Sequence, residues 1–224
     1  MMLQLERVLK PEQLENVRRT LARAEFVNGK LSAGKTASAV KNNEELKTTA
    51  QLMELLNNEV MGSLVSHPIY QAGALPQRVA SPFYARYTPG MFYGDHVDDP
   101  VMGIEGQHYR SDISITVFLN DPEEYEGGEL VINSSYGQNK VKLAAGDAVM
   151  YPSSSLHHVT EVTKGERLVA VTWVQSMVRH PAQRELLYTL YQAKEKLLES
   201  APNEEISNQV NTAYVNLMRM WVDI

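Results

Sequence analysis

The stretch RSDISITVFLN, residues 110–120, alternates between two kinds of side chain, and this pattern constrains the fold more than any other feature. Its aliphatic residues share one face: Ile113, Ile115, Val117 and Leu119. A period of two is that of a β-strand with one face in a core. Further short runs follow at fairly regular spacing, separated by turns that contain glycine: residues 127–132, 139–143, 147–152, 157–162 and 167–176. This spacing favours an antiparallel sandwich or barrel over alternating strands and helices.

Helical patterns flank this strand-rich middle. Apolar residues at helical spacing predict helices over residues 11–25, 44–65, 182–199 and 204–222. Pro11 suits the first turn of the first helix, Pro68 ends the second, and Pro202 separates the last two. We therefore expect a mainly β fold with flanking helices.

The same patterns divide the chain into three parts. We expect an N-terminal helical cover over residues 1–78, a strand-rich core over 79–178 and a C-terminal helical extension over 179–224. The extension can pack on the core, cap it or form the contact of a homodimer.

Composition excludes several classes of protein. With 224 residues, 43% of them hydrophobic, the chain can bury a substantial core. A net charge of −6 and scattered Lys and Arg argue against a nucleic-acid surface. The N-terminus MMLQLERVLKPEQ has no signal-peptide pattern and no run approaches 18 apolar residues, so we expect no membrane contact and a cytoplasmic protein. The absence of Cys leaves His and carboxylates as the ligands for any metal.

A His-x-Asp pair lies in the segment YGDHVDDPVMG, residues 93–103. In an extended chain His96 and Asp98 project from the same face, so they can offer one nitrogen and one oxygen to a shared ion. With six His and 27 acidic residues in 224, about 0.7 such pairs are expected by chance, so the pair alone is weak evidence for a site. A second His would complete the two-His, one-carboxylate set that leaves open positions on Fe(II).

The candidates for that second His are His67, His108, His157, His158 and His180. Only His157 and His158 lie on a predicted core strand, and adjacent strand residues face opposite sides, so at most one of them is a ligand. Periodicity does not choose between them, and a surface or core role is the ordinary alternative for either.

Arg167 opens the strand RLVAVTWVQS and shares its parity with Val171 and Trp173, a face that can point into the core. A guanidinium there requires an anion, and its planar fork suits a carboxylate. The alternative is an exposed Arg at the hairpin turn TKGER. Chance produces the three features together, His-x-Asp, a later strand His and this Arg, much less often than it produces any one of them alone.

The segments around these residues resemble those of a known family. RYTPGMFYGDHVD, from Arg86 to Asp98, fits the R-Y-x-x-G-x-x-Y-x-x-H-x-D pattern of the prolyl 4-hydroxylase-like branch of the iron(II) and 2-oxoglutarate dioxygenases. The later segments FLNDPEEYEGGELVI, AGDAVMYPSSSLHHV and GERLVAVTWVQSMVR resemble the bacterial PKHD-type hydroxylases in particular. The likeness runs from Lys41 into the C-terminal extension.

This resemblance implies a double-stranded β-helix, or jelly roll, that binds Fe(II) through His96, Asp98 and a distal His. In the family the distal ligand is the His of S-S-L-H-x-V, which selects His157, and the Arg that binds 2-oxoglutarate follows ten residues later, which selects Arg167. Tyr87 matches a tyrosine of the pattern to which we assign a cosubstrate contact. Some relatives present another tyrosine from the strand here occupied by residues 113–119, where this chain has none.

The implied activity is that of an oxidoreductase, a hydroxylase that consumes O2 and 2-oxoglutarate and releases succinate and CO2. L-Ascorbate is expected as a reductant, and the substrate is an unidentified small molecule or peptidyl group. The alternatives are a jelly-roll metal-binding module and a zinc hydrolase with the same ligands. The loop of residues 99–110 could be a lid, and its acidity favours a cationic ligand.

Overall fold

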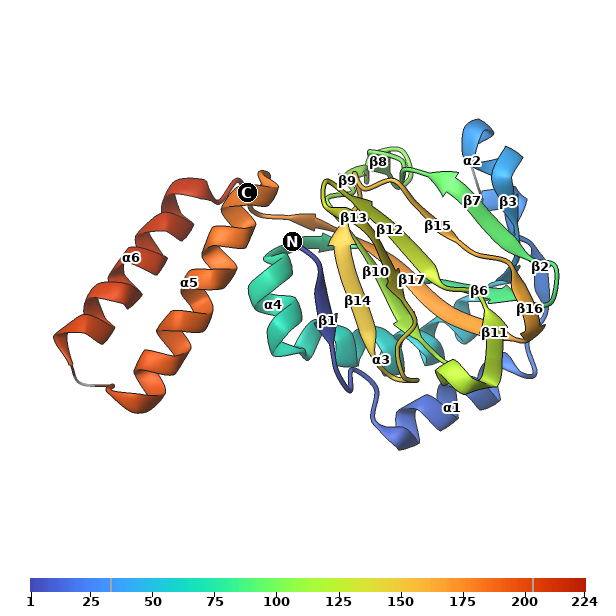
Figure 1. The fold of residues 1–224 in the computed structure, drawn as a ribbon, viewed down its shortest axis with the longest axis horizontal. Helices are drawn as coiled ribbons and strands as arrows, with labels where there is room; N and C mark the ends of the chain where they lie inside the picture. Colours follow the sequence, from blue (N-terminus) through green and yellow to red (C-terminus); the bar gives the residue numbers. More distant parts are fainter. Residues whose placement is uncertain (33, 203) are drawn as a thin grey trace.

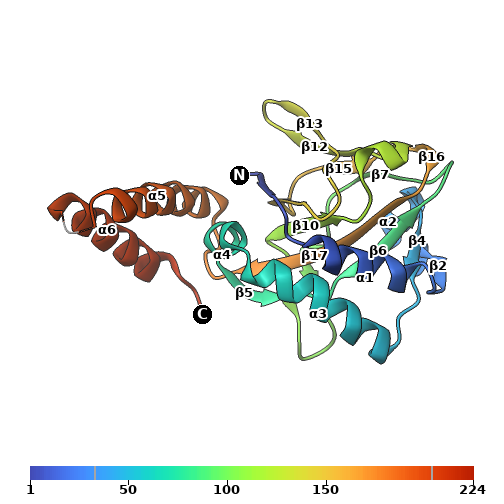
Figure 2. The same cartoon turned by 90° about the horizontal axis from the view of Figure 1, so that it is seen from below.

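The alternating run 110–120 forms strand β10 (Ile113–Phe118) in the computed structural model, which describes residues 1–32, 34–202 and 204–224. Ile113, Ile115 and Val117 belong to a buried cluster shared with the N-terminal helices. Phe118, of opposite parity, belongs to a second buried cluster between two sheets. Both faces of β10 are therefore covered, by helices on one side and by another sheet on the other (Figures 1 and 2).

The larger sheet has the strand order β1-β14-β10-β17-β6-β4-β2, with β5 paired to β17, and its pairs are antiparallel. Besides β10, it consists of β1 (Leu3–Leu5), β2 (Phe26–Asn28), β4 (Glu44–Leu46), β5 (Pro76–Val79), β6 (Phe83–Tyr87), β14 (Ala148–Pro152) and β17 (Arg167–Ser176).

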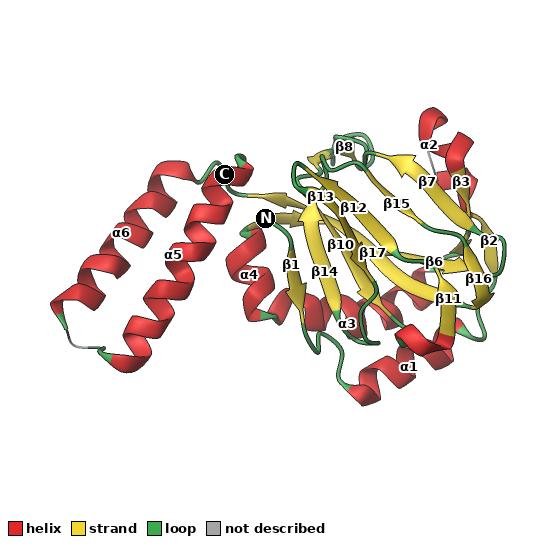
Figure 3. Ribbon diagram, in the orientation of Figure 1, coloured by secondary structure: helices red, strands yellow, loops and turns green. Residues whose placement is uncertain are grey.

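The smaller sheet, which faces it, has the order β13-β12-β15-β7-β3. Its strands are β3 (Lys41–Asn42), β7 (Phe92–His96), β12 (Leu130–Ser134), β13 (Gly137–Val141) and β15 (His157–Val159). Two short ribbons complete the strands: β8 (Val101–Met102) with β9 (Tyr109–Arg110), and β11 (Tyr125–Gly127) with β16 (Val162–Gly165). Two facing antiparallel sheets confirm the predicted jelly roll (Figure 3).

Helices cover the outer face of the larger sheet (Figure 2). They are α1 (Pro11–Leu21), α3 (Ala50–Ser66) and α4 (Pro68–Ala74), while α2 (Lys35–Val40) lies beside β7. Val17, Leu56 and Val60 are buried against the aliphatic face of β10, so amphipathic helices close this side of the core. No helix in the described part of the chain has the length and apolar character needed to cross a membrane.

The sequence predicted a helical N-terminal third, but the structure differs: strands β1 to β5 also come from this part of the chain. The second helix begins at Ala50 rather than near Glu44, since the Thr49 side chain caps it by accepting a hydrogen bond from the Leu52 amide (3.2 Å). Glu44 instead lies in β4, where its carboxylate accepts a hydrogen bond from Arg86 of the neighbouring strand (2.7 Å). Cross-strand pairing here outweighs the helical pattern of the sequence.

The C-terminal helices α5 (Pro181–Ser200) and α6 (Glu205–Trp221) form an antiparallel hairpin that projects from one end of the sandwich (Figure 1). Leu187 of α5 is fully buried against Leu75 and Val178, and Trp221 packs on the same cluster. Of the arrangements considered from the sequence, the hairpin therefore packs on the core beside α4.

Candidate active site

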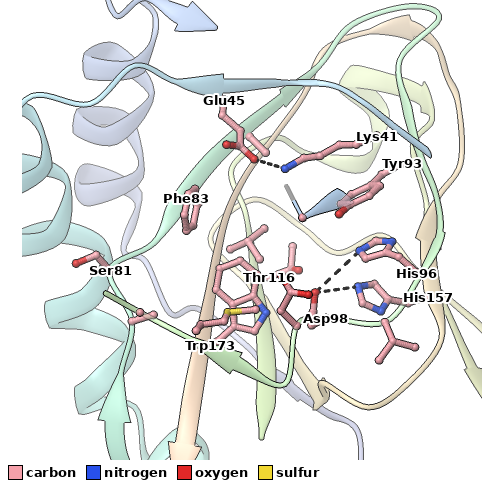
Figure 4. Close-up of a pocket in the computed structure, with 18 of the residues that line it drawn as sticks. Lys41, Glu45, Ser81, Phe83, Tyr93, His96, Asp98, Thr116, His157 and Trp173 are labelled. Carbon is pink, nitrogen blue, oxygen red and sulfur yellow. Dashed lines mark hydrogen bonds and ion pairs between the residues drawn. The ribbon is translucent and has the colours of Figure 1, made fainter. Parts of the chain in front are cut away.

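Two strands of the smaller sheet bring His96 and His157 together. His96 ends β7 and His157 begins β15, and the two are directly opposite each other in the antiparallel pair. Asp98 follows His96 by two residues, and its Oδ1 lies 4.0 Å from His96 Nε2 and 3.9 Å from His157 Nε2. Donor atoms of the three side chains lie within 4.8 Å of one another and converge on one point (Figure 4).

Backbone carbonyls hold both imidazoles in this orientation. His96 Nδ1 lies 2.8 Å from the Gly94 carbonyl oxygen, and His157 Nδ1 lies 2.9 Å from that of Ser155. Each Nδ1–H therefore donates to the backbone, which leaves the Nε2 lone pairs directed at Asp98. Burial, and then the neighbouring His157, lower the pKa of His96 to about 4, so His96 is neutral near pH 7.

Asp98 is oriented from the opposite sheet. Ser114 of β10 donates a hydrogen bond from its hydroxyl to Asp98 Oδ2, and its oxygen also lies 2.8 Å from the hydroxyl oxygen of Ser153. Both serines are buried, at 0% and 2% exposure. The second carboxylate oxygen is thereby occupied, and Oδ1 is left facing the two imidazoles. Ser114 and Ser153 were not among the predicted site residues, although Ser114 is a small polar residue within a buried strand.

An aromatic stack supports His96. The Tyr93 ring lies parallel to the imidazole, with centroids 3.6 Å apart. Lys41 of β3 places its Nζ 5.3 Å from the centroid of Tyr93, and the same ammonium forms a buried ion pair with Glu45 of β4. The N-terminal segment thus forms one wall of the site, a role that the sequence pattern did not reveal.

Arg167 begins β17 opposite Tyr87 of β6 and is only 2% exposed. Its guanidinium carbon lies 4.9 Å from the centroid of Tyr87 and 5.8 Å from that of Phe118. Among the residues that the structure describes, none accepts a hydrogen bond from Arg167 Nε. The burial of Arg167 excludes the alternative that the sequence left open, in which Arg167 is an exposed residue of the hairpin turn.

Two further tyrosines that sequence reasoning missed lie near Arg167. Burial raises the pKa of Tyr125, and the positive charge of Arg167 opposes the rise. Burial likewise raises the pKa of Tyr151, which interacts with the charges of both Asp98 and Arg167. Tyr151 pairs with Ser114 in the sheet, so a tyrosine of the strand next to β10 lies near Arg167, whereas β10 itself has none.

One cavity of about 1170 Å³ contains the His96–Asp98–His157 cluster and reaches Arg167, Tyr87 and Tyr151. Residues of the β8–β9 ribbon and of the loop between its strands line the cavity, so this segment borders the candidate site, and its role as a lid stays a prediction. The other histidines lie elsewhere. His158 turns outward and its Nδ1 lies 2.7 Å from Asp95 Oδ1, while His67, His108 and His180 do not line the cavity.

Known proteins are similar to this chain in sequence and in fold. Residues 82–175 match the model of the 2OG-Fe(II) oxygenase superfamily. A PKHD-type hydroxylase of Thioalkalivibrio sulfidiphilus is 51% identical over 224 residues, which is 100% of both chains. The chain belongs to the 2OG-Fe(II) oxygenase superfamily. The PKHD-type hydroxylase YbiX of Shigella flexneri is 41% identical over 226 residues, again 100% of both chains.

Solved structures agree on the fold. A prolyl-4-hydroxylase of Pseudomonas putida has a TM-score of 0.52 at 19% identity, covering 78% of this chain and 92% of that chain. A prolyl hydroxylase of Trichoplax adhaerens, in complex with a peptide fragment, has a TM-score of 0.55 at 14% identity, covering 78% and 83%. The predictions of a PKHD-type hydroxylase family, a jelly roll and an oxygenase are confirmed.

Proposed function

We propose that this protein is an Fe(II)- and 2-oxoglutarate-dependent dioxygenase that hydroxylates a C–H bond of its substrate and releases succinate and CO2. His96, Asp98 and His157 hold the iron, and Arg167 binds the distal carboxylate of 2-oxoglutarate. Tyr87, whose ring lies against the guanidinium, contributes to the same cosubstrate site.

The residues present fit the metal. Two imidazole nitrogens and one carboxylate oxygen are suitable donors for a borderline divalent ion, and three protein ligands leave positions open for other molecules. The low pKa of His96 supports this assignment, because a metal requires the unprotonated imidazole. Ser114 and the two backbone carbonyls fix the donors before an ion arrives.

The observation that carries the proposal is the buried guanidinium of Arg167 in the same cavity as this cluster. A buried charge is costly unless it is paired, and Nε of Arg167 has no acceptor in the described part of the chain. A dicarboxylate that reaches from the metal to Arg167 supplies the missing anion. Neither a zinc hydrolase nor a metal-binding module needs such a clamp, so both alternatives are less well supported.

The bound iron supplies the activation of O2, which is coupled to oxidative decarboxylation of 2-oxoglutarate and oxidation of the substrate. The chain itself supplies binding and orientation. Arg167 fixes one end of the cosubstrate, Tyr151 lies near both Arg167 and Asp98, and the surrounding apolar side chains exclude water. The lid residues of the β8–β9 ribbon border the place where a substrate enters.

The test is anaerobic addition of Fe(II) and 2-oxoglutarate to the metal-free protein, followed by visible absorption spectroscopy. We expect the charge-transfer band of the metal–cosubstrate chelate. His96→Ala should abolish it, and Arg167→Met should require far more 2-oxoglutarate to form it. His158→Ala is the matched control, because His158 is adjacent in sequence but turned outward. Absence of the band in the unmodified protein would refute the proposal.

Several finer points belong to the same proposal. L-Ascorbate acts as a reductant that keeps the iron in the ferrous state, and the protein works in the cytoplasm, with the C-terminal hairpin available for a homodimer. Residues 1–78, 79–178 and 179–224 act as cover, catalytic core and extension. The substrate is a small molecule or a peptidyl group, and the peptide bound to the Trichoplax prolyl hydroxylase supports the peptidyl class.

A further inference from the structure

The candidate cavity is longer than a cosubstrate site requires. Trp173 lies six residues beyond Arg167 on β17 and lines the same cavity, so the two are separated by about 20 Å along the strand. The ring of Phe83 packs edge-on against Trp173, with centroids 5.6 Å apart. Figure 4 shows Trp173 beside Asp98, with Phe83 farther from it. Burial, followed by the charge of Asp98, raises the pKa of Tyr109. The part of the cavity lined by Phe83, Tyr109 and Trp173 therefore forms a second compartment beside the three metal-binding side chains.

This compartment has an apolar mouth. Four large apolar residues that line the cavity are also exposed to solvent: Phe83 (43%), Val97 (50%), Val101 (60%) and Ile104 (71%). Met102, Tyr109 and Trp173 continue the same surface inward. Grouped exposed apolar residues around a cavity mark a place where a ligand covers them.

The charged groups in the inner part of the cavity wall are already matched. Lys41 pairs with Glu45, Asp98 belongs to the metal cluster, and Arg167 faces 2-oxoglutarate under the proposed function. Arg78 and Asp99 are exposed at the rim, where water screens their charges. Arg78 also donates a hydrogen bond to the His108 carbonyl (3.0 Å).

Of the two acidic residues of the lid, Asp99 lies at the exposed rim of the cavity and Glu105 is not part of its wall. The expectation of a cationic ligand drawn from the lid sequence therefore stays a prediction for the rim, beside Asp99. A substrate ammonium carried past the rim would lose its hydration, and the carboxylates it meets there are Glu45, which is paired with Lys41, and Asp98 of the metal-binding set.

We infer that the substrate group bound beside the metal cluster is uncharged and apolar, an aliphatic side chain rather than a cationic one. This inference rests on the proposed function and specifies its substrate class. The indole Nε1–H of Trp173 is buried, faces Asp98 in Figure 4 and has no acceptor among the described residues. A carbonyl group next to the aliphatic side chain provides that acceptor, as an amino-acid amide does.

The chain contains two tryptophans, so Trp221→Phe leaves Trp173 as a single fluorescent reporter inside the compartment. The probes are N-acetyl-leucinamide and N-acetyl-lysinamide, which share a backbone and differ in side-chain charge. They are titrated anaerobically into protein loaded with Mn(II) and 2-oxoglutarate. We expect the leucine amide to change Trp173 fluorescence with an affinity at least about tenfold higher than that of the lysine amide.

A second measurement needs no tryptophan substitution. Mn(II) bound in the unmodified protein should broaden the methyl proton resonances of the leucine amide in NMR spectra, which places the side chain beside the metal. Ile104→Ser and Val101→Ser should each weaken binding several-fold. Leu31→Ser is the control, since Leu31 is 82% exposed and lies outside the cavity.

Equal or tighter binding of the lysine amide, no saturable response to the leucine amide, or serine variants that bind like the unmodified protein would overturn the inference. The Fe(II)–2-oxoglutarate band separates this failure from that of the proposed function. If the band forms and the selectivity is absent, only the substrate class is wrong. If the band does not form, the proposed function itself fails.

Discussion

Replacing Ser114 by Ala should weaken metal binding without removing a ligand. The Ser114 hydroxyl donates to Asp98 Oδ2, and both it and its neighbour Ser153 are buried. In Ser114→Ala the carboxylate loses that hydrogen bond, so it can rotate away from His96 and His157. A hydrogen bond to a charged group contributes about 1.5–3 kcal/mol, and outer partners of metal ligands typically change affinity 10- to 100-fold. We expect a loss of affinity in that range.

The assay is isothermal titration calorimetry of the metal-free protein with Co(II), which does not depend on turnover. Ser207→Ala is the matched control: Ser207 is also fully buried and donates to the Ala201 carbonyl (2.6 Å), but it lies in the C-terminal hairpin. Both variants should lose similar stability in urea unfolding. Only Ser114→Ala should lose affinity for Co(II), and unchanged affinity in that variant would refute the orienting role.

Three further predictions concern the cosubstrate end and the extension. Arg167→Met should raise the dissociation constant for 2-oxoglutarate about 30-fold or more in calorimetry on the Mn(II)-loaded protein, because one partner of a buried charge pair is removed; a smaller change would contradict the clamp. Tyr151→Phe keeps the ring but removes a buried hydroxyl near Asp98 and Arg167, so the same constant should rise about three- to tenfold, and an unchanged value would exclude contact with the cosubstrate. Leu187→Ala should lower the free energy of unfolding by about 2–5 kcal/mol in urea, since Leu187 is fully buried, while 2-oxoglutarate affinity stays unchanged.

Local periodicity predicted the parts of the site that depend on strand parity. Arg167 shares its parity with Val171 and Trp173, and all three line the cavity. The choice between His157 and His158 was beyond periodicity, because adjacent strand residues are equivalent until the partner strand is known. In the structure that partner is β7, which places His157 directly opposite His96, and only the family resemblance could anticipate this.

Other features depend on contacts between distant parts of the chain, and no local pattern reports these. Lys41 and Glu45 read as ordinary charged residues, yet they form a buried pair because β3 joins the smaller sheet and β4 joins the larger one. The helical pattern over residues 44–65 was misleading at its start for the same reason. Residues 44–46 fit either structure alone, and pairing with β6 decides between them.

The distribution of the site over two sheets explains why these long-range contacts matter. His96 and His157 come from the smaller sheet, whereas Arg167 and Ser114 come from the larger one. Asp98 is the link, because one of its oxygens faces the imidazoles and the other accepts a hydrogen bond from Ser114 across the sandwich. Any shift of one sheet relative to the other changes the distance between the three metal-binding side chains and Arg167. Under the proposed function, a dicarboxylate of fixed length must match this distance. Close packing of the core between the sheets is therefore, under the same proposal, a condition for cosubstrate binding as well as for stability.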